Sequence, residues 1–271
     1  MADTFQIITA LRYDQLLAEC PARDPGVPID LNSSQLYMLQ RHHYRMLAAI
    51  KDFNWPENCK DSVAALEGHI RAYLESKKGE FDPQEPLKIR AALSWTGTMD
   101  ITSTKIAPVS PKCLFPRSLS SIVKSGMTFG DGDSPPTFRL VFSTVPITYN
   151  LFTKHKTTRR ESYDHARSQT LASIEQSSGE SDSLLPIEVL LYNQFGQMME
   201  GTITTPYFFR RGDWVTPLPE CGGNVGTTRQ YALDHSLCKE GIVEIGSIQR
   251  GEKVALSNGV RGFGWGIVEM I

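Results

Sequence analysis

Four separate segments of the chain carry residues whose types and spacing could do chemistry. A basic run, KHKTTRR, occupies residues 154–160, and Glu200 stands on an otherwise apolar and aromatic stretch. A glycine-rich loop leads into Thr227 and Thr228, and Arg45 follows two histidines in an early helical pattern. Each segment has a functional interpretation and an ordinary structural one.

The basic run is most simply a solvated cluster of surface charges. Alternatively, a lysine of this run could lie on a strand beside other cations. Repulsion and desolvation would then lower the pKa of its amine and make it nucleophilic toward a carbonyl group. The run by itself fits both interpretations.

The loop before Thr227 could bind a phosphate group. In the segment ECGGNVGTTRQYALDHSL, the first helical turn would contain Gly226, Thr227 and Thr228. A helix N-terminus has unpaired N–H groups and a partial positive charge, and glycines let an anion approach them. An ordinary capped helix explains the same pattern. The segment is neither a Walker A loop nor a GxGxxG fingerprint, so it does not indicate a nucleotide.

Glu200 and Arg45 are also open to two interpretations. A carboxylate on a strand usually lies at an exposed edge, and burial would require a cationic partner. A helical arginine is usually solvated along one face. His42 and His43 would indicate a metal only with a third ligand nearby, and the sequence offers none, so we expect no metal site.

The composition is that of a packed globular protein. The chain has 271 residues, 40% hydrophobic content and a net charge of −2, so no positive field would attract nucleic acid or an anionic membrane surface. No stretch approaches the roughly 18 apolar residues of a spanning helix, and the N-terminus lacks the pattern of a secretory signal. We expect a soluble, cytoplasmic protein. Its five cysteines are scattered, which predicts free thiols rather than structural zinc.

The periodicity of the first third predicts a small sheet with two helices. Apolar residues recur at helical spacing in residues 34–55, after possible capping residues at 32–34, and again in residues 62–79. Residues 87–95 and 98–104 alternate around a turn and predict a hairpin. Residues 106–136 are rich in Pro, Ser and Gly, and we place a domain boundary there, between residues 1–130 and 131–271.

The second part of the chain is dominated by strand patterns. A polar helix is expected at residues 161–176 and another beginning near Thr227. Strands are expected on β-type composition at residues 137–146, 187–193, 204–217 (a hairpin), 242–248 and 253–259. The sequence therefore predicts an α+β protein with a small domain followed by a larger, strand-dominated one.

The order of the four segments resembles the class IV aminotransferase fold, that of the fold-type IV pyridoxal-phosphate enzymes related to D-amino acid aminotransferase. The resemblance rests on an H-x-x-R-[ML] helix, a KTT lysine, an EG pair before an aromatic hairpin, G-x-x-R opening a helix, and N-G-V-R-G near the end. It extends from Phe5 to Trp265. The strings HHYRMLAAIKDFNW, FTKHKTTRRESYDHAR and EGTITTPYFFRRGDWVTP resemble the fungal 4-amino-4-deoxychorismate lyases in particular.

This resemblance implies pyridoxal 5'-phosphate as the cofactor. Lys156 matches the lysine that carries the cofactor covalently and also acts as acid and base. Glu200 matches the carboxylate beneath the pyridine nitrogen, where a fixed negative charge keeps that nitrogen protonated. Such a nitrogen would be the cationic partner that a buried Glu200 requires.

The resemblance also implies which residues hold the cofactor phosphate. Thr227 and Thr228 match residues that offer backbone N–H groups and a hydroxyl, and Arg45 matches an arginine of the small domain that binds the same phosphate. Asn258 corresponds to a further loop on the phosphate side.

The implied reaction converts 4-amino-4-deoxychorismate to 4-aminobenzoate and pyruvate. Arg12, or the cations Lys154, Arg159 and Arg160 around Lys156, could bind the substrate carboxylates, and Arg12 and Arg159 are the candidates that we name. A homodimer is implied as well. The alternatives are a transaminase of the same fold, with identical cofactor residues, and a non-catalytic relative, against which the retention of the lysine, the acid and both threonines argues.

One departure concerns the segment after the EG pair. Many relatives have asparagine followed by valine or leucine there, whereas this chain has Thr204, Thr205 and Pro206. Proline removes a ladder donor and could alter the strand edge near the cofactor. We expect this difference to affect which substrate the protein binds more than whether it binds the cofactor.

Overall fold

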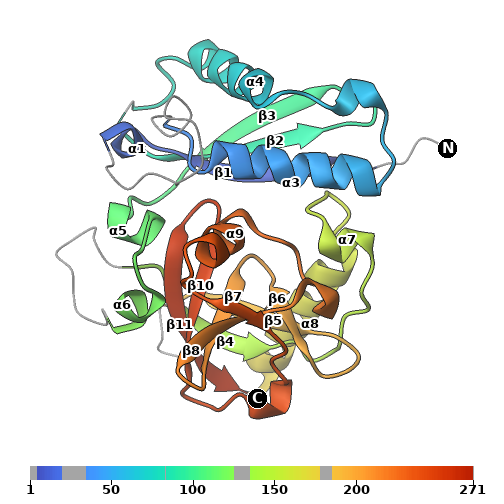
Figure 1. Cartoon of the computed structure of the whole chain (residues 1–271), viewed down its shortest axis with the longest axis vertical. Helices are drawn as coiled ribbons and strands as arrows, with labels where there is room; N and C mark the ends of the chain where they lie inside the picture. Colours follow the sequence, from blue (N-terminus) through green and yellow to red (C-terminus); the bar gives the residue numbers. More distant parts are fainter. Residues whose placement is uncertain (1–4, 20–34, 83, 125–134, 178–184, 271) are drawn as a thin grey trace.

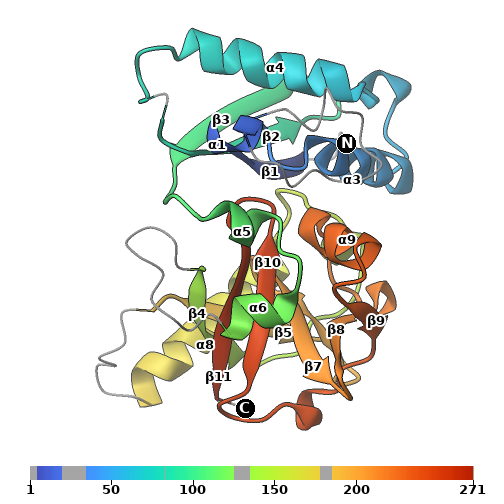
Figure 2. The same ribbon diagram turned by 60° about the vertical axis from the view of Figure 1, so that its left-hand side comes forward.

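The chain forms two sheets, each with its own helices (Figures 1 and 2). The structure is a computed structural model, and it describes residues 5–19, 35–82, 84–124, 135–177 and 185–270. The predicted α+β class is confirmed. The predicted boundary between residues 130 and 131 lies outside the described residues. The division at that point stays a prediction, which the presence of two sheets supports.

The smaller sheet has three antiparallel strands in the order β1-β2-β3. These are β1 (Ile7–Tyr13), β2 (Leu87–Leu93) and β3 (Met99–Lys105). Successive side chains of a strand point to opposite faces, so Ile7, Leu11 and Ile89 share one face and are almost wholly buried there. Their cluster with apolar residues of two helices forms the core of this part of the molecule.

Two helices cover that apolar face, α3 (Leu39–Asp52) and α4 (Val63–Ser76). The side chain of Ser62 caps α4 by accepting a hydrogen bond from Ala65 N, as the sequence pattern of this helix start favours. Helix α3 starts after Met38, which has left-handed backbone geometry (φ 52°) and makes no side-chain cap. The capping residues expected at 32–34 lie outside the described residues.

The larger sheet has eight strands in the order β6-β5-β4-β11-β10-β7-β8-β9. The pairs β4–β5, β4–β11 and β8–β9 are parallel, and the others are antiparallel. The strands are β4 (Thr137–Phe142), β5 (Ile187–Tyr192), β6 (Met198–Gly201), β7 (Thr205–Arg210), β8 (Asp213–Pro217), β9 (Lys239–Gly241), β10 (Lys253–Asn258) and β11 (Gly262–Met270).

Short helices and one long helix surround this sheet (Figure 1). They are α5 (Pro111–Leu114), α6 (Leu119–Lys124), α7 (Leu151–Lys154), α8 (Glu161–Ser177) and α9 (Thr227–Asp234), besides α1 (Leu16–Glu19) beside the smaller sheet. Three single turns complete the described elements: η1 (Glu57–Cys59), η2 (Pro219–Cys221) and η3 (Ile245–Ser247). The helices expected at 161–176 and from Thr227 are confirmed.

One predicted strand is wrong, and the strand considered as one interpretation of the basic run does not form. The basic run does not form a strand of its own, because Asn150 caps a short helix, α7, that includes Lys154. The residues after it are extended and touch β1 through a single bridge between Ile7 and Thr157. Residues 242–248 form no strand either: β9 ends at Gly241 and the turn η3 follows, so β-type composition alone misled the prediction.

Pro206 is accommodated inside the sheet. It lies opposite Leu256 in the β7–β10 pair, while pairing of β7 with β8 begins only at Phe208. The strand thus continues through the proline, and the strand start at Thr205 stays beside the site described below.

The predicted absence of disulfides among the cysteines holds for the four that the structure describes. Cys59, Cys113, Cys221 and Cys238 are all buried and none of them forms a disulfide, and Cys20 lies outside the described residues. A search of the described helices finds none that is both long and apolar enough to cross a membrane.

Candidate active site

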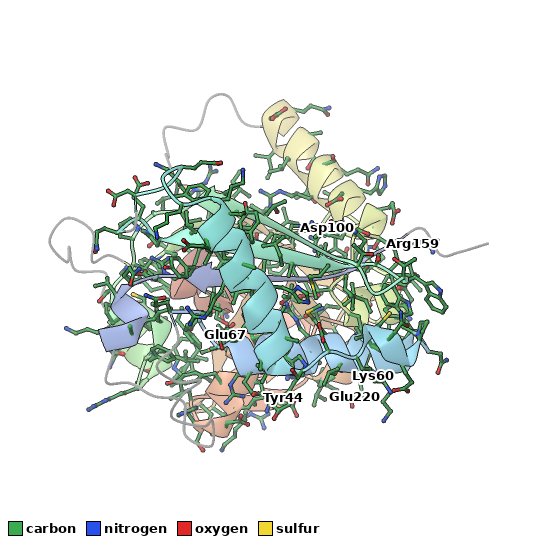
Figure 3. All side chains as sticks on the ribbon, turned by 90° about the horizontal axis from the view of Figure 1, so that it is seen from above. Tyr44, Lys60, Glu67, Asp100, Arg159 and Glu220 are labelled. Atoms are coloured by element: carbon green, nitrogen blue, oxygen red, sulfur yellow. The ribbon has the colours of Figure 1, made fainter. Side chains whose placement is uncertain are left out.

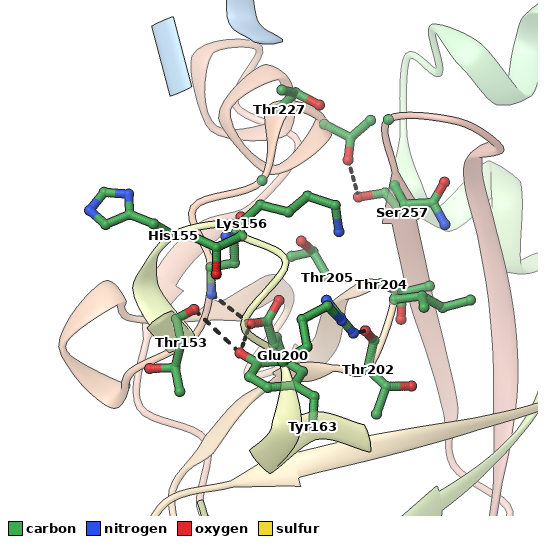
Figure 4. A pocket seen from close by; sticks show the side chains of 18 of the residues that line it. Thr153, His155, Lys156, Tyr163, Glu200, Thr202, Thr204, Thr205, Thr227 and Ser257 are labelled. Carbon is green, nitrogen blue, oxygen red and sulfur yellow. Dashed lines mark hydrogen bonds between the residues drawn. The ribbon is translucent and has the colours of Figure 1, made fainter. Parts of the chain in front are cut away.

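A pocket of about 530 Å³ brings together most of the residues that the sequence singled out. It lies at the edge of the larger sheet that faces the smaller one, where the extended segment after α7 meets β6 and the start of α9 (Figures 1 and 4). The residues that line it include Lys156, Glu200, Thr227, Thr228 and Asn258.

Lys156 extends across the pocket between Glu200 and the start of α9 (Figure 4). Its backbone carbonyl accepts a hydrogen bond of 2.9 Å from Ile8 N, which ties the lysine to the smaller sheet. Burial, and then the positive charges of Arg160 and Arg45, lower the pKa of its amine to about 7, against an opposing effect of Glu200. Near neutral pH a large fraction of this amine is therefore unprotonated and nucleophilic.

Three cations were expected around Lys156, and one of them lies in the pocket. Arg160 lines the pocket, and its Nη2 donates a hydrogen bond of 2.8 Å to the carbonyl of Thr202. Lys154 turns away and forms an ion pair of 2.7 Å with Asp52. Arg159 is exposed at the periphery and lies over the ring of Phe152 (Figure 3).

Glu200 is buried rather than exposed at a strand edge, with only 9% of its surface accessible. Tyr163 Oη and Asn224 N, the latter at 2.7 Å, both donate to its Oε1 atom. Within the described part of the chain, no hydrogen bond reaches Oε2. Burial raises the pKa of Glu200, and these two hydrogen bonds and the charges of Lys156 and Arg160 oppose that rise.

Helix α9 begins at the other end of the pocket. Its N-cap is Gly226, which has no side chain to satisfy the first N–H groups, and Thr227 and Thr228 in the first turn are buried. The hydroxyl of Ser257 donates a hydrogen bond of 2.8 Å to the Thr228 hydroxyl, and Tyr207 bonds to Ser257 in turn. The side chain of Asn258 accepts from two backbone N–H groups and fixes the turn after β10.

Arg45 reaches this end of the pocket from α3. It lines an adjoining cavity together with Gly226 and Thr227. Its Nη2 atom donates a hydrogen bond of 2.6 Å to Thr9 Oγ1, while its buried Nε atom has no partner among the described residues. Burial lowers the pKa of Arg45 to about 10, so the guanidinium is still charged at neutral pH. The solvated interpretation of this arginine is therefore wrong.

His42 links the two parts of the molecule and was not anticipated as a site residue. It is fully buried, with Nδ1 at 2.7 Å from Thr9 Oγ1 and Nε2 at 3.5 Å from Thr227 Oγ1. Burial, and then the charges of Arg45 and Lys156, hold the pKa of His42 well below its usual value, so the imidazole is neutral. The H-x-x-R pattern contained the signal, because His42 and Arg45 share a helix face.

Arg12 and Arg159 lie outside the lining of this pocket. Arg12 is completely buried under the smaller sheet, where its Nε forms an ion pair of 2.7 Å with Asp14. Its Nη1 donates to the carbonyl of Ala107 at 3.2 Å, and its Nη2 has no partner within the described chain. A role of either arginine in substrate binding stays a prediction.

The histidine pair of α3 does not join a metal-ligand set. In the described ranges, no group of three or more His, Cys, Asp or Glu residues is arranged to hold a metal ion. His43 instead bonds through Nε2 to the carbonyl of Asp61 at 2.7 Å.

Similarity to known proteins agrees with the geometry. The sequence matches the family described as amino-transferase class IV over residues 29–265. Aminodeoxychorismate lyase of Saccharomyces cerevisiae (strain ATCC 204508 / S288c) is 30% identical over 216 residues, or 76% of this chain and 56% of the yeast protein. The chain thus spans little more than half the length of that relative.

Solved structures share the fold at low sequence identity. An aminotransferase from Brucella abortus, bound to the cofactor PLP, superposes with a TM-score of 0.61 at 14% identity, covering 98% of this chain and 81% of that one. The branched-chain amino acid aminotransferase of Escherichia coli gives a TM-score of 0.58 at 13% identity, covering 98% of this chain and 76% of that one. The chain belongs to the class IV aminotransferase family.

Proposed function

We propose that this protein is a pyridoxal-phosphate-dependent lyase that converts 4-amino-4-deoxychorismate to 4-aminobenzoate and pyruvate. The observation that carries the proposal is the polarity of the pocket. A carboxylate stands at one end, a helix N-terminus beside the adjoining cavity of Arg45 stands at the other, and a lysine of lowered pKa lies between them. The name of the yeast relative supports the choice of reaction.

The positive end of the pocket fits the cofactor phosphate. The first N–H groups of α9 lack a side-chain cap, and the partial positive charge of the helix N-terminus favours an anion there. The unpaired Nε of Arg45 is a buried donor that an anionic oxygen would satisfy. We propose that Thr227, Thr228 and Arg45 hold the phosphate, with Asn258 shaping the adjacent turn.

The negative end fits a protonated pyridine nitrogen. Glu200 is buried and has one carboxylate oxygen without a hydrogen bond from the described residues. A buried carboxylate needs a cationic partner, and a pyridinium nitrogen would be one. We propose that Glu200 is that partner and that Lys156, which lies between the two ends, carries the cofactor covalently.

Bound pyridoxal phosphate supplies an electron sink, because its protonated ring takes up the electron pair released when the C–H bond at the amino-bearing carbon breaks. In the proposed reaction the substrate amine would take the place of Lys156 on the cofactor, and the Lys156 amine freed in this way removes the proton from C4 of the substrate. The bond from C3 to the enolpyruvyl oxygen breaks, the ring becomes aromatic, and the released enolpyruvate takes up a proton to give pyruvate. Lys156 can accept the C4 proton because its lowered pKa, about 7, leaves a substantial fraction of free amine near neutral pH.

Arg160 is placed to bind a substrate carboxylate. The substrate carries two carboxylates, and Arg160 is a guanidinium on the pocket wall. One of its nitrogens is anchored on Thr202 O, which leaves further donors for a ligand. Its neighbour Arg159 points away from the pocket. We therefore favour Arg160 over Arg159 for this role.

We further propose a cytoplasmic homodimer, which the resemblance to class IV enzymes supports. A transaminase of the same fold is the alternative function, and it would use the same cofactor residues. The products distinguish the two reactions, because a lyase releases pyruvate without an amino acceptor, whereas a transaminase needs one.

The test is to incubate the purified protein, saturated with pyridoxal phosphate, with 4-amino-4-deoxychorismate and to quantify both products. We expect equal amounts of pyruvate and 4-aminobenzoate, loss of both in Lys156→Ala, and no loss in Lys112→Ala, which removes an exposed lysine. If the protein instead transferred an amino group to a 2-oxo acid and released no pyruvate, the proposed lyase function would be wrong and the transaminase function would be supported.

A further inference from the structure

Tyr163 makes the contact that orients Glu200. It lies on α8 and is only 5% exposed, and its hydroxyl donates to Glu200 Oε1 (Figure 4). The same hydroxyl lies 3.3 Å from the carbonyl of Thr153, in the short helix that precedes Lys156. Tyr163 therefore touches both the acid of the pocket and the element that presents the lysine.

We propose that Tyr163 is a positioning residue for Glu200: it fixes one carboxylate oxygen so that the other is left for the ring nitrogen of the cofactor. The inference rests on the proposed function. Asn224 N donates to the same oxygen from the loop before α9. Two donors on Oε1, from different elements, fix the rotation of the carboxylate about its last bond.

The ring of Tyr163 is itself held in place. It packs in the apolar cluster of α8 and β5, which includes Ala166 and Val189. The guanidinium of Arg160 lies over its face, 5.0 Å from the ring centre. The hydroxyl thus has little freedom to leave Glu200, and a phenylalanine in its place would keep the packing.

The hydrogen bond also acts on the charge of Glu200. Burial raises the pKa of this carboxyl, and the bond from Tyr163 is the largest of the effects that oppose the rise. The remaining ones are the backbone N–H of Asn224 and the charges of Lys156 and Arg160. Burial and the neighbouring Glu200 raise the pKa of Tyr163 well above its usual value, so the phenol keeps its proton and remains a donor.

The experiment compares Tyr163→Phe with Tyr73→Phe. Tyr73 is a matched control, because its hydroxyl is also hydrogen-bonded, to Ser103 on the smaller sheet and away from the pocket. The first readout uses the protein without cofactor. Carboxyl-labelled glutamate is followed by carbon-13 NMR against pH, and the signal of Glu200 is assigned by its loss in Glu200→Gln.

We expect Glu200 to titrate at a higher pH in Tyr163→Phe than in the wild-type protein and to be unchanged in Tyr73→Phe. In the loaded enzyme, we expect kcat to fall by about tenfold or more, as for the loss of a hydrogen bond to a charged group, with KM nearly constant. An unchanged titration of Glu200 together with an unchanged kcat would overturn the proposal.

The titration also separates this inference from the proposed function. If the wild-type protein released no pyruvate, the lyase assignment would fail, while the NMR readout would still report whether Tyr163 controls Glu200. If Tyr163→Phe lost activity through general destabilisation, its thermal midpoint would fall and Glu200 would titrate as in the wild-type protein, which would also count against a positioning role.

Discussion

At the scale of single residues, the protonation state of Lys156 governs the proposed chemistry. The fold lowers the pKa of this amine to about 7, so it is protonated below that pH and becomes neutral as the pH rises through it. Acetylation of the cofactor-free protein with a limiting amount of reagent should therefore reach half its maximal rate at Lys156 near pH 7. Peptide mass spectrometry measures this site by site.

The exposed Lys112 is the internal reference for that measurement. It is exposed and lies outside the pocket, so it shows how the reagent itself responds to pH. If Lys156 followed the same pH profile as Lys112, the environment described for the pocket would be wrong.

Replacing Glu200, the carboxylate of the pocket, tests the negative end of the proposed cofactor site. Glu200→Gln keeps the shape and one acceptor oxygen but removes the charge that would hold a pyridine nitrogen protonated. We expect the cofactor to remain bound while kcat falls by about 100-fold or more, since preorganised charge near a reacting centre has effects of this size. Steady-state kinetics with a parallel determination of bound cofactor checks this, and an unchanged kcat would refute the role of Glu200.

The sequence identified these two residues because they stand in a recognisable order along the chain. It did not identify Tyr163, because the sequence around a tyrosine on a polar helix does not show whether its side chain is buried or which residue it contacts. It also gave no ground for choosing Arg160 over Arg159. Adjacent residues of an extended segment face opposite ways. Which of the two arginines faces the pocket depends on the bridge of this segment to β1 and on the hydrogen bond of Arg160 to Thr202. The amino-acid composition does not predict these contacts.

At the scale of elements, the segment that carries Lys156 is attached to α3. Asp52, at the end of that helix, accepts hydrogen bonds of 2.7 Å from Lys154 Nζ and 2.8 Å from His155 Nε2. These bonds hold the pKa of Asp52 below its usual value. A lowered carboxyl pKa stabilises the fold above the unfolded-state pKa, and this stabilisation is lost as the pH falls through the folded-state pKa.

Asp52→Ala should accordingly reduce the free energy of unfolding by about 1 kcal/mol at neutral pH. The difference from the wild-type protein should shrink as the pH falls below about 4, the ordinary aspartate pKa. Urea unfolding at several pH values measures both effects. A difference that did not depend on pH would show that the ion pairs contribute nothing and that only packing was lost.

A second buried carboxylate stabilises residues that line the pocket. Glu188 is fully buried and accepts hydrogen bonds from Ile203 N at 2.8 Å, from Thr204 N at 3.1 Å and from the hydroxyls of Thr202 and Thr204. These contacts shape the segment between β6 and β7. Thr202 and Thr204 thus satisfy a buried acid.

Glu188→Ala should lower the free energy of unfolding by about 3 kcal/mol, because it leaves several buried donors without an acceptor. Glu57→Ala, which truncates an exposed glutamate, serves as the control and should change stability by less than about 0.5 kcal/mol. Equal effects of the two substitutions in urea unfolding would contradict the account of this segment.

Among the elements, helices and hairpins with strong periodicity could be predicted from the sequence, and isolated apolar runs could not. Helices α4 and α8 and the β2–β3 hairpin are found at the expected places. Residues 242–248 have strand-like composition, yet Val243 and Ile248 are buried as parts of an irregular segment against the sheet. Burial of apolar side chains does not by itself require strand pairing.

At the scale of the whole molecule, the site depends on contacts between the two sheets. Ile8 N bonds to Lys156 O, Thr158 N bonds to Gln6 O, and His42 reaches Thr227, so β1 with the residue before it and α3 hold both the lysine segment and the start of α9. The motif order predicted that these segments belong to one site. The contacts themselves join residues that are far apart in the chain, and the periodicity of a sequence does not show which distant residues meet.

The assembly state is also a property of the whole molecule. The proposed homodimer should have twice the chain mass of 30.3 kDa in solution. Light scattering after size-exclusion chromatography measures this mass. A single-chain mass at micromolar concentration would refute the dimer without affecting the assignment of the pocket.

The most direct test of the central claim asks which residue carries the cofactor. The purified protein is incubated with pyridoxal phosphate, reduced with borohydride, digested and analysed by mass spectrometry. We predict one modified peptide, with the cofactor attached to Lys156, and none in Lys156→Ala. Attachment to another lysine, or no stable attachment in the wild-type protein, would contradict the account.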